Sequence, residues 1–318
     1  MKIIVPGGTG QVGNVLKRAF RAKGHEVLFL SRNASNSEDI IYWDAKTLGD
    51  WTQEIDGADA VINLAGRSVN CRYTKKNLKA MMNSRVDSNR IIGKAICQAD
   101  RPPRVWLQAS TATIYAHTFG KPHDENTGLI GGNEADVPKY WKISIDIARA
   151  WERALDEAKT PQTRKVALRS AMIMSPDKGG IFDTLLNLTR LGLGGAIAGG
   201  KQFVSWIHEH DFVRSVEFLL EHDEFEGVVN LSSPNPLSQK EFMAAIRHAC
   251  GMPIGLPATK WMISVGAFFM RTDPELILKS RRVIPGRLLD AGFTFRYPEW
   301  TEAATELVER SKSRAQST

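Results

Sequence analysis

Three glycines near the start of the chain have the spacing of a phosphate-binding turn. The segment "GGTGQVG" holds Gly7, Gly10 and Gly13, with the apolar run "KIIVP" before it and a helical pattern after it. The first glycine permits a tight turn, the second lets the backbone approach a pyrophosphate, and the third lets helix and strand pack closely. Free amides at the helix N-terminus then bind the phosphates. The alternative is a turn that needs glycine only for its own shape. We predict a dinucleotide at Gly7, Gly8, Thr9, Gly10, Gln11, Val12 and Gly13.

The end of the next strand bears on which dinucleotide is bound. NAD sites of this kind usually place an acidic side chain there to bind the ribose 2′-hydroxyl. Here the strand ends "FLSRN", so Ser31 and Arg32 stand in that place and no acid does. An arginine suits a 2′-phosphate because its planar guanidinium can donate two parallel hydrogen bonds. The pattern favours NADP(H) over NAD(H); the alternative is that Arg32 is an ordinary solvated arginine.

Alternating strand and helix patterns surround this turn. Short apolar runs such as "KIIVP", "EVLFLSR", "ADAVINLAG" and "RVWLQAS" alternate with longer segments of helical periodicity. This order predicts an α/β fold of Rossmann type, with a doubly wound parallel sheet. After about residue 175 the chain becomes rich in glycine. We expect an NADP-binding domain at 1–174, and at 175–318 mainly a smaller C-terminal α/β substrate cap, with some later segments returning to the first domain.

The bulk composition narrows the class of protein. The chain has 318 residues and a formal charge of +7, but Lys and Arg are scattered among Asp and Glu, which argues against nucleic acid as a partner. Cys71, Cys97 and Cys250 have no metal or disulfide spacing, so we expect no metal site and a reducing compartment.

"WMISVGAFFM" (261–270) is half the length of a membrane span. We expect a core or interdomain helix there, and a cytoplasmic protein without membrane contact or secretory signal.

Several motifs together resemble a known family. "VPGGTGQVG", "NLAG", "STATIYA", "LRSAMIM" and "SWIHEHDFV" stand in the order of the extended short-chain dehydrogenase/reductases, within the NAD-dependent epimerase/dehydratase superfamily. "VINLAGRSVNCRYTKKNLKAMMNSRV", "GLGGAIAGGKQFVSWIHEHD" and "VIPGRLLDAGFTFRYPEW" resemble its YfcH-like branch. The resemblance runs from end to end. It implies a Rossmann-type domain, a small C-terminal cap and a bound nicotinamide dinucleotide.

The resemblance also assigns further residues to the cofactor. Asp44 matches an aspartate near the adenine, and Leu64, Ala65 and Gly66 match the strand end under the adenine ribose and pyrophosphate. Arg85 matches the arginine of the branch's "SRV", which could bind the cofactor or pair with a carboxylate within the fold. Relatives also suggest a homodimer through helices such as 77–98 and 140–158.

The catalytic residues of the larger family are incomplete here. Typical members use a Ser or Thr, a Tyr, and a Lys four residues after that Tyr. Thr111, with Ser110 beside it, matches the first group. Four residues after Tyr140 stands Ser144; in the register set by "WE" at 151–152, Ser144 takes the tyrosine position and Ala148 the lysine position. A serine hydroxyl is a far weaker acid than a phenol, and alanine carries no charge.

Other side chains could move a proton or line a substrate pocket. Tyr115 follows the strand that ends at Thr111 and is a candidate proton donor, although packing is the alternative role. Asp211 is expected to cap the helix of "FVRSVEFLL". The alternative for His208 is to orient a loop by hydrogen bonding. The substrate-pocket candidates are Tyr140, Lys142, Trp206 and His208.

Two functions remain open. The first is an NADP(H)-dependent oxidoreductase or epimerase that acts on a small carbonyl or sugar-like substrate, with Thr111 at the substrate oxygen. The second is a dinucleotide-binding sensor or scaffold with little or no turnover, which the missing Tyr–Lys pair motivates. The glycine-rich segment "GLGGAIAGGKQ" favours the first, because such a loop can enclose a small molecule.

Overall fold

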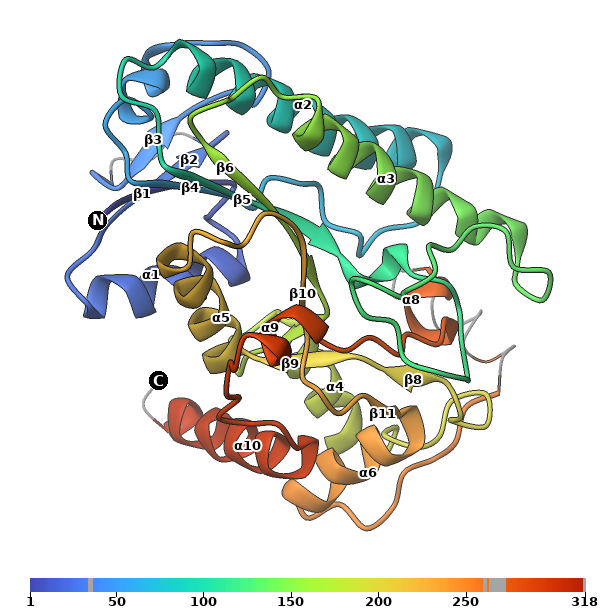
Figure 1. Ribbon diagram of the computed structural model, residues 1–318. Helices are drawn as coiled ribbons and strands as arrows, with labels where there is room; N and C mark the ends of the chain where they lie inside the picture. Colours follow the sequence, from blue (N-terminus) through green and yellow to red (C-terminus); the bar gives the residue numbers. More distant parts are fainter. Residues whose placement is uncertain (34–36, 260–261, 263–272, 317–318) are drawn as a thin grey trace.

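A parallel sheet forms the centre of the molecule (Figure 1). The computed structural model describes residues 1–33, 37–259, 262 and 273–316. Within them, seven strands pair in the order β10-β6-β5-β4-β1-β2-β3, and every pairing is parallel. The predicted Rossmann-type fold is thereby confirmed. The strands are β1 (Lys2–Pro6), β2 (Glu26–Ser31), β3 (Ile40–Tyr42), β4 (Ala60–Asn63), β5 (Val105–Thr111), β6 (Arg164–Ser170) and β10 (Gly227–Leu231).

Helices cover both faces of this sheet (Figure 1). One face carries α1 (Gln11–Ala22) and α5 (Glu209–Glu221), and the other carries α2 (Lys75–Gln98) and α3 (Lys142–Asp156). Successive side chains of a strand point to opposite faces. Ile3 of β1 therefore packs with α1 and α5, whereas Ile4 packs with α2 and α3. Burial on both faces explains why the strands read as continuous apolar runs.

A smaller unit lies beyond the sheet's β10 end. It contains β7 (Met172–Met174) paired with β9 (Trp206–His208), and β8 (Phe203–Val204) paired with β11 (Leu237–Ser238). Its core is aromatic: the Trp300 ring stacks on Phe242 with centroids 4.1 Å apart and lies 4.7 Å from Trp206. The helices of the later chain are α4 (Ile181–Arg190), α6 (Gln239–Ala249), α8 (Glu275–Leu278), α9 (Gly286–Asp290) and α10 (Trp300–Gln316).

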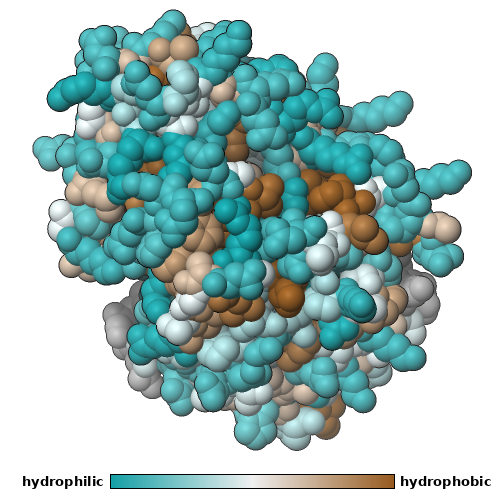
Figure 2. Space-filling view, viewed as in Figure 1, coloured by the Kyte–Doolittle hydropathy of each residue, from teal (hydrophilic) through white to brown (hydrophobic). Residues whose placement is uncertain are grey.

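Short 3-10 helices complete the fold: η1 (Asp50–Glu54), η2 (Ala112–Ile114) and η3 (Lys139–Trp141). The second of these follows β5 directly, so the chain turns sharply at Thr111. Figure 2 shows, in the same view as Figure 1, a mostly hydrophilic face with apolar residues gathered near its middle. Among the described residues, no helix is both long and apolar enough to cross a membrane. The helix expected at 261–270 lies outside the described residues, apart from Met262.

One predicted helix cap is wrong. The helix α5 begins at Glu209, and its N-cap is His208, whose side chain accepts a hydrogen bond from the His210 amide. Asp211 thus lies inside the first turn. Its carboxylate instead accepts the backbone amides of Arg296 and Tyr297, at 2.7 and 2.8 Å. The aspartate ties a distant segment to the helix, which the local sequence could not indicate.

Candidate functional site

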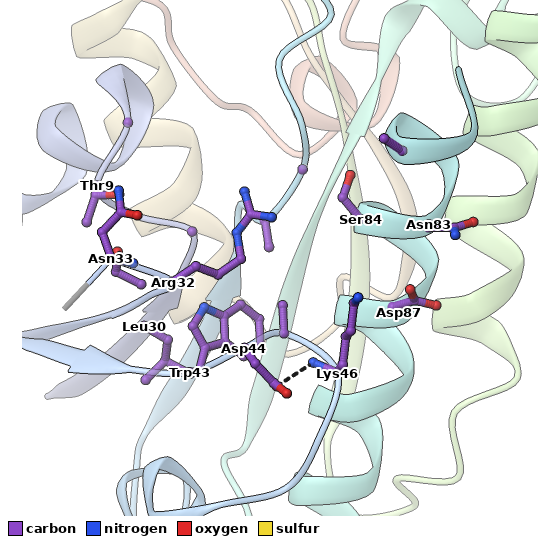
Figure 3. Close-up of a pocket in the computed structure, with 17 residues that line it drawn as sticks. Thr9, Leu30, Arg32, Asn33, Trp43, Asp44, Lys46, Asn83, Ser84 and Asp87 are labelled. Atoms are coloured by element: carbon purple, nitrogen blue, oxygen red, sulfur yellow. Dashed lines mark hydrogen bonds between the residues drawn. The ribbon is translucent and has the colours of Figure 1, made fainter. Parts of the chain in front are cut away.

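A cavity of about 500 Å³ opens at the carboxyl ends of β1, β2 and β4 (Figure 3). Ligands of open α/β sheets bind at this edge, where the strand order reverses. The wall opposite the glycine turn is formed by α2. The cavity is lined by Gly7, Thr9, Gly10, Leu30, Ser31, Arg32, Asn33, Trp43, Asp44, Ala45, Lys46, Ala65, Gly66, Ala80, Asn83, Ser84 and Asp87.

Each glycine of the turn meets a different constraint. Gly7 has φ +73°, and an added Cβ would lie 2.6 Å from the Ala65 Cα. A Cβ on Gly13 would lie 1.9 Å from the Gly8 carbonyl oxygen, so the helix and the turn pack too closely for any side chain. A Cβ on Gly10 would meet no atom within 4 Å. No close packing within the protein therefore requires glycine at position 10, and the lack of a side chain leaves open space beside the turn.

The start of α1 can bind an anion. Gly10 is its N-cap, no side chain caps the helix, and its first turn contains no acidic residue. The amides there are therefore available, and the positive end of the helix dipole favours negative charge. The open space at Gly10 would let a phosphate reach those amides.

The other predicted residues of the turn have separate places. Thr9 lines the cavity, whereas Val12 packs against the core under the sheet. Gly8 lies against the Phe29 ring. The Gln11 side chain lies in another hollow beside Gly180, and its buried Nε2 has no hydrogen-bond partner in the described part of the chain. Thus the turn's backbone and Thr9, rather than all of its side chains, form the cavity wall.

Two cationic side chains extend into the cavity. Figure 3 shows that Arg32, from the end of β2, and Lys46 both point toward the gap between the glycine turn and α2. Ser31 is buried, and its hydroxyl accepts the Asn33 amide at 3.1 Å. No acidic residue stands directly after β2, as the sequence indicated. Asn33, which follows β2, and Lys46, whose position depends on the loop after β3, were not predicted.

Asp44 holds that loop in place. Its carboxylate accepts hydrogen bonds from the Lys46 amide, the Thr47 amide and the Thr47 hydroxyl, each at 2.8 Å. These bonds, the Thr47 amide first, lower the pKa of Asp44. Ala45, between Asp44 and Lys46, has φ +62°, a backbone conformation that residues other than glycine rarely adopt. Asp44 therefore lines the cavity and also directs Lys46 toward it.

Arg85 supports the cavity floor from behind. Its guanidinium donates to the carbonyls of Arg67 and Met81, both at 3.1 Å, and lies 4.8 Å from the Trp151 ring centroid. A Cβ on Gly66 would lie 3.3 Å from the Arg85 guanidinium carbon. Burial lowers the pKa of Arg85 to about 10. Of the neighbouring strand-end residues, Ala65 and Gly66 line the cavity, and Leu64 packs against the core.

The hydroxyls of Ser110 and Tyr115 belong to a buried network. Ser110 donates to Glu152 at 2.5 Å, and Arg169 binds both oxygens of that carboxylate, at 2.8 and 2.7 Å. Arg169 also donates to the Tyr115 hydroxyl at 3.0 Å, and Tyr115 donates to Asn230 Oδ1 at 2.9 Å. Tyr115 is 1% exposed. This placement favours the packing role for Tyr115.

Thr111 differs from these two residues. It is partly exposed, and its hydroxyl oxygen accepts the Thr113 amide at 3.1 Å. Within the residues that the structure describes, the hydroxyl proton is donated to no acceptor, so it could be donated to a ligand.

The four substrate-pocket candidates do not come together. Trp206 and His208 are fully buried in the smaller unit, where His208 Nε2 lies 3.0 Å from Glu306. Tyr140 is 42% exposed. Lys142 pairs with Asp146 and lines a second cavity of about 320 Å³ with, among others, Glu134, Trp141 and Lys279. In the described residues, no group of His, Cys, Asp or Glu could hold a metal ion.

Ser144 has two neighbours that were not predicted as site residues. Its hydroxyl donates a hydrogen bond to Glu275 Oε2 at 2.6 Å. Burial raises the pKa of Tyr73, and Ser144 acts in the opposite direction. The signal for Tyr73 was its place in the loop that follows β4. No local signal pointed to Glu275, which stands 131 residues after Ser144.

Comparison with known proteins decides the family. Residues 3–232, well over half of the chain, match the NAD dependent epimerase/dehydratase family. The chain belongs to this family. Residues 258–307 match a second family, described only as a domain of unknown function (DUF1731). The family expected from the motifs is confirmed.

Relatives of similar length match the chain almost end to end. The epimerase family protein SDR39U1 of Bos taurus is 31% identical, over 97% of this chain and 100% of its own. The epimerase family protein YfhF of Bacillus subtilis is 28% identical, over 98% of this chain and 100% of the length of YfhF. The crystal structure of human epimerase family protein SDR39U1 with NADPH is 29% identical, with a TM-score of 0.85 over 97% of this chain and 99% of that chain.

Proposed function

We propose that this chain binds NADP(H) in the cavity at the glycine turn and is an oxidoreductase or epimerase of a small carbonyl or sugar-like substrate. The observation that carries the proposal is the pair of cationic side chains, Arg32 and Lys46, that point into the cavity, together with the lack of an acid directly after β2. A 2′-phosphate needs such partners, and a free 2′-hydroxyl does not. Human SDR39U1, which resembles this chain over nearly its whole length, was crystallised with NADPH.

The residues divide the binding task. The amides at the start of α1 would hold the diphosphate, and the open side of Gly10 would admit it. Arg32 and Lys46 would bind the 2′-phosphate, with Asp44 fixing the loop that carries Lys46. When bound, a reduced nicotinamide supplies hydride. Thr111, at the carboxyl end of β5, would donate a hydrogen bond to the substrate oxygen.

The alternative is a dinucleotide-binding sensor without turnover. Ala148, in the position of the family's lysine, is buried in the core beneath η2, and the Ser110 hydroxyl is occupied by Glu152. Neither can assist proton transfer in the manner of typical relatives. An oxidoreductase and a sensor share the cofactor and differ in whether bound NADPH is consumed, whereas an epimerase would return its cofactor to the starting state in each turnover.

The proposal is tested first by binding. Protein stripped of cofactor is titrated with NADPH and with NADH, and Arg32→Ala is compared with Arg90→Ala, which removes an exposed arginine on α2 that does not line the cavity. A lost hydrogen bond to a charged group costs about 1.5–3 kcal/mol. We therefore expect Arg32→Ala to weaken NADPH binding by about tenfold to 100-fold while NADH binding is unchanged. Equal affinity of the wild type for the two dinucleotides would contradict the NADP(H) assignment.

Turnover then separates the two functions. NADPH absorbance is followed with benzaldehyde, hexanal, phenanthrenequinone and fructose as carbonyl probes. Oxidation that depends on both probe and protein supports the oxidoreductase. Tight NADPH binding with no oxidation argues against the oxidoreductase and agrees with the sensor or with an epimerase.

A further inference from the structure

The second cavity, of about 320 Å³, lies where the loop before α3, the start of α3 and the residue after α8 meet. Among the described residues, it shares no lining residue with the cavity at the glycine turn. Its volume is within the range of small-molecule sites, which begins at about 300 Å³. Three lysines line it: Lys139, Lys142 and Lys279. The proposed cofactor site does not explain this cluster of positive charge.

Lys279 is a buried cation with few partners. It is 2% exposed, and its Nζ donates to the Thr113 carbonyl at 2.7 Å. An ammonium group can donate three hydrogen bonds. In the described part of the chain, Nζ donates no other hydrogen bond, and no carboxylate forms an ion pair with it. Two of its protons are therefore left without an acceptor among these residues.

Lys165 shows how the same fold satisfies a structural lysine. Its Nζ donates to three backbone carbonyls, at distances of 3.0 to 3.1 Å, although the residue is partly exposed. Lys279 is more deeply buried and has one such acceptor. A buried charge is costly to desolvate, so its hydrogen bonds are normally made. The contrast indicates that a further acceptor completes Lys279, and the cavity that it lines has room for one.

Trp141 adds a second donor to the same cavity. It is 6% exposed, and its indole Nε1 is buried without a hydrogen-bond partner in the described residues. An unpartnered indole N–H does not identify a site by itself, because Trp151 has one too and does not line the cavity. What distinguishes Trp141 is that it lines the same cavity as an incompletely partnered cation.

The charge balance of the cavity favours an anion. Its acidic lining residue is Glu134, whose two oxygens accept the backbone amides of His117 and Gly132 at 2.9 and 2.6 Å. This carboxylate is thus engaged by its own loop. Lys142 is paired with Asp146 at the helix surface. Three lysines against two carboxylates still leave the cavity with a net positive charge.

The remaining wall is apolar. Val137, Pro138 and Ile145 line the cavity, and Ile145 is 1% exposed. A bare inorganic anion would leave these side chains in contact with water. A ligand with a hydrocarbon body would cover them while its charged end met the two donors, which is the usual division of a small-molecule site.

We propose that this cavity binds a small organic carboxylate. The carboxylate accepts hydrogen bonds from the Lys279 ammonium group and the Trp141 indole N–H. Its hydrocarbon body packs against Val137, Pro138 and Ile145. The site is separate from the proposed NADP(H) site, and the inference does not rest on that function.

Titration of Lys279 gives this binding a pH dependence. Burial, and then the nearby Arg281, lower the pKa of Lys279 to about 8, whereas Glu275 and Glu134 act in the opposite direction. The carboxylate binds the charged form of the amine. Its affinity should therefore be constant below about pH 7 and fall by up to about tenfold per pH unit above about pH 8.

The test is calorimetric titration of the protein with benzoate. Benzamide, which has the same shape without the charge, and inorganic phosphate, which has charge without a hydrocarbon body, are titrated in parallel. Benzoate is also titrated into protein saturated with NADPH. Lys279→Met removes the cation at similar length. Trp141→Phe removes one N–H, and Trp151→Phe removes the equally unpartnered N–H that does not line the cavity. The melting temperature of each variant is measured as well.

We expect benzoate to bind with a dissociation constant on the order of 1 mM or tighter, with or without NADPH. Benzamide and phosphate should each bind at least about tenfold more weakly. Lys279→Met should weaken benzoate binding by at least about tenfold and abolish its pH dependence, and Trp141→Phe should weaken it by at least about fivefold. Trp151→Phe should bind benzoate as the wild type does.

Several results would overturn the proposal. Equal binding of benzoate and benzamide would show that the cavity does not recognise charge, and phosphate that binds more tightly than benzoate would exclude the hydrocarbon body. Competition between benzoate and NADPH would place benzoate in the first cavity. If Lys279→Met does not fold, wild-type benzoate affinity in Trp141→Phe overturns the site by itself. A protein that binds benzoate as expected but not NADPH would remove the proposed function and leave this site standing.

Discussion

Replacing Gly10 by alanine is expected to weaken dinucleotide binding while leaving the fold intact. Gly10 has φ −82° and ψ 180°, which alanine adopts without strain, and the new methyl group would meet no protein atom within 4 Å. As an N-cap change, the substitution should cost less than about 1 kcal/mol of stability. The methyl group would instead occupy the space through which a diphosphate approaches the α1 amides. Loss of one or two hydrogen bonds to a charged group, about 1.5–3 kcal/mol each, lowers affinity by at least about tenfold.

Gly13→Ala provides the contrasting variant. Its Cβ would lie 1.9 Å from the Gly8 oxygen and 2.4 Å from the Gly8 carbonyl carbon, so the helix must move away from the turn. Overpacking of this kind typically costs about 1–3 kcal/mol. Gly13→Ala should therefore lower the melting temperature, which Gly10→Ala should change by no more than about 3 °C.

The two variants are compared by thermal unfolding and by NADPH fluorescence titration. The structure predicts that Gly10→Ala loses affinity at nearly wild-type stability, and that Gly13→Ala loses stability. Wild-type NADPH affinity in Gly10→Ala would show that no phosphate approaches this turn, and would refute the assignment of the cavity. A stable Gly13→Ala protein would refute the close packing between the turn and α1.

Two further predictions concern stability. Glu152→Ala removes the carboxylate that pairs with the buried Arg169, so it should lower the free energy of unfolding by about 3 kcal/mol, measured by urea denaturation. Lys142→Ala breaks only an exposed ion pair and should lower it by about 0.5 kcal/mol. Equal losses in the two variants would contradict the buried network. Hydrogen bonds from Lys17 and Ser37 lower the pKa of Asp39 from 3.8 to about 2, so the folded state holds this proton less tightly than the unfolded chain. The stability that wild type has over Asp39→Asn should therefore be complete above about pH 4 and lost as the pH falls to about 2, and a difference that persists at lower pH would contradict this.

Local chemistry made part of the structure predictable. The glycine turn and the parallel strands depend on residues close in sequence, and the structure has both. The absence of an acid after β2 was likewise visible in the sequence. The place of Lys46 in the cavity could not be predicted from the sequence, because its direction depends on a turn that the Asp44 carboxylate stabilises by accepting backbone amides.

Partners distant in sequence account for what could not be predicted. Tyr115 looked free to act at a substrate, but its hydroxyl binds Asn230, 115 residues away. His208 in "SWIHEHD" looked like a pocket residue, but Glu306, 98 residues on, occupies its Nε2. Glu275 reaches Ser144 only because the C-terminal segment folds back over β5. Spacing along a chain predicts elements and turns, whereas the hydrogen-bond partners of a buried polar group are set by the tertiary fold.

The most direct test of the central claim is a crystal structure of the protein with NADPH bound. We predict the diphosphate over Gly10 at the start of α1, with the 2′-phosphate within hydrogen-bonding distance of the Arg32 guanidinium or the Lys46 ammonium group. A dinucleotide bound outside this cavity, or one whose 2′-phosphate contacts neither cation, would contradict the account.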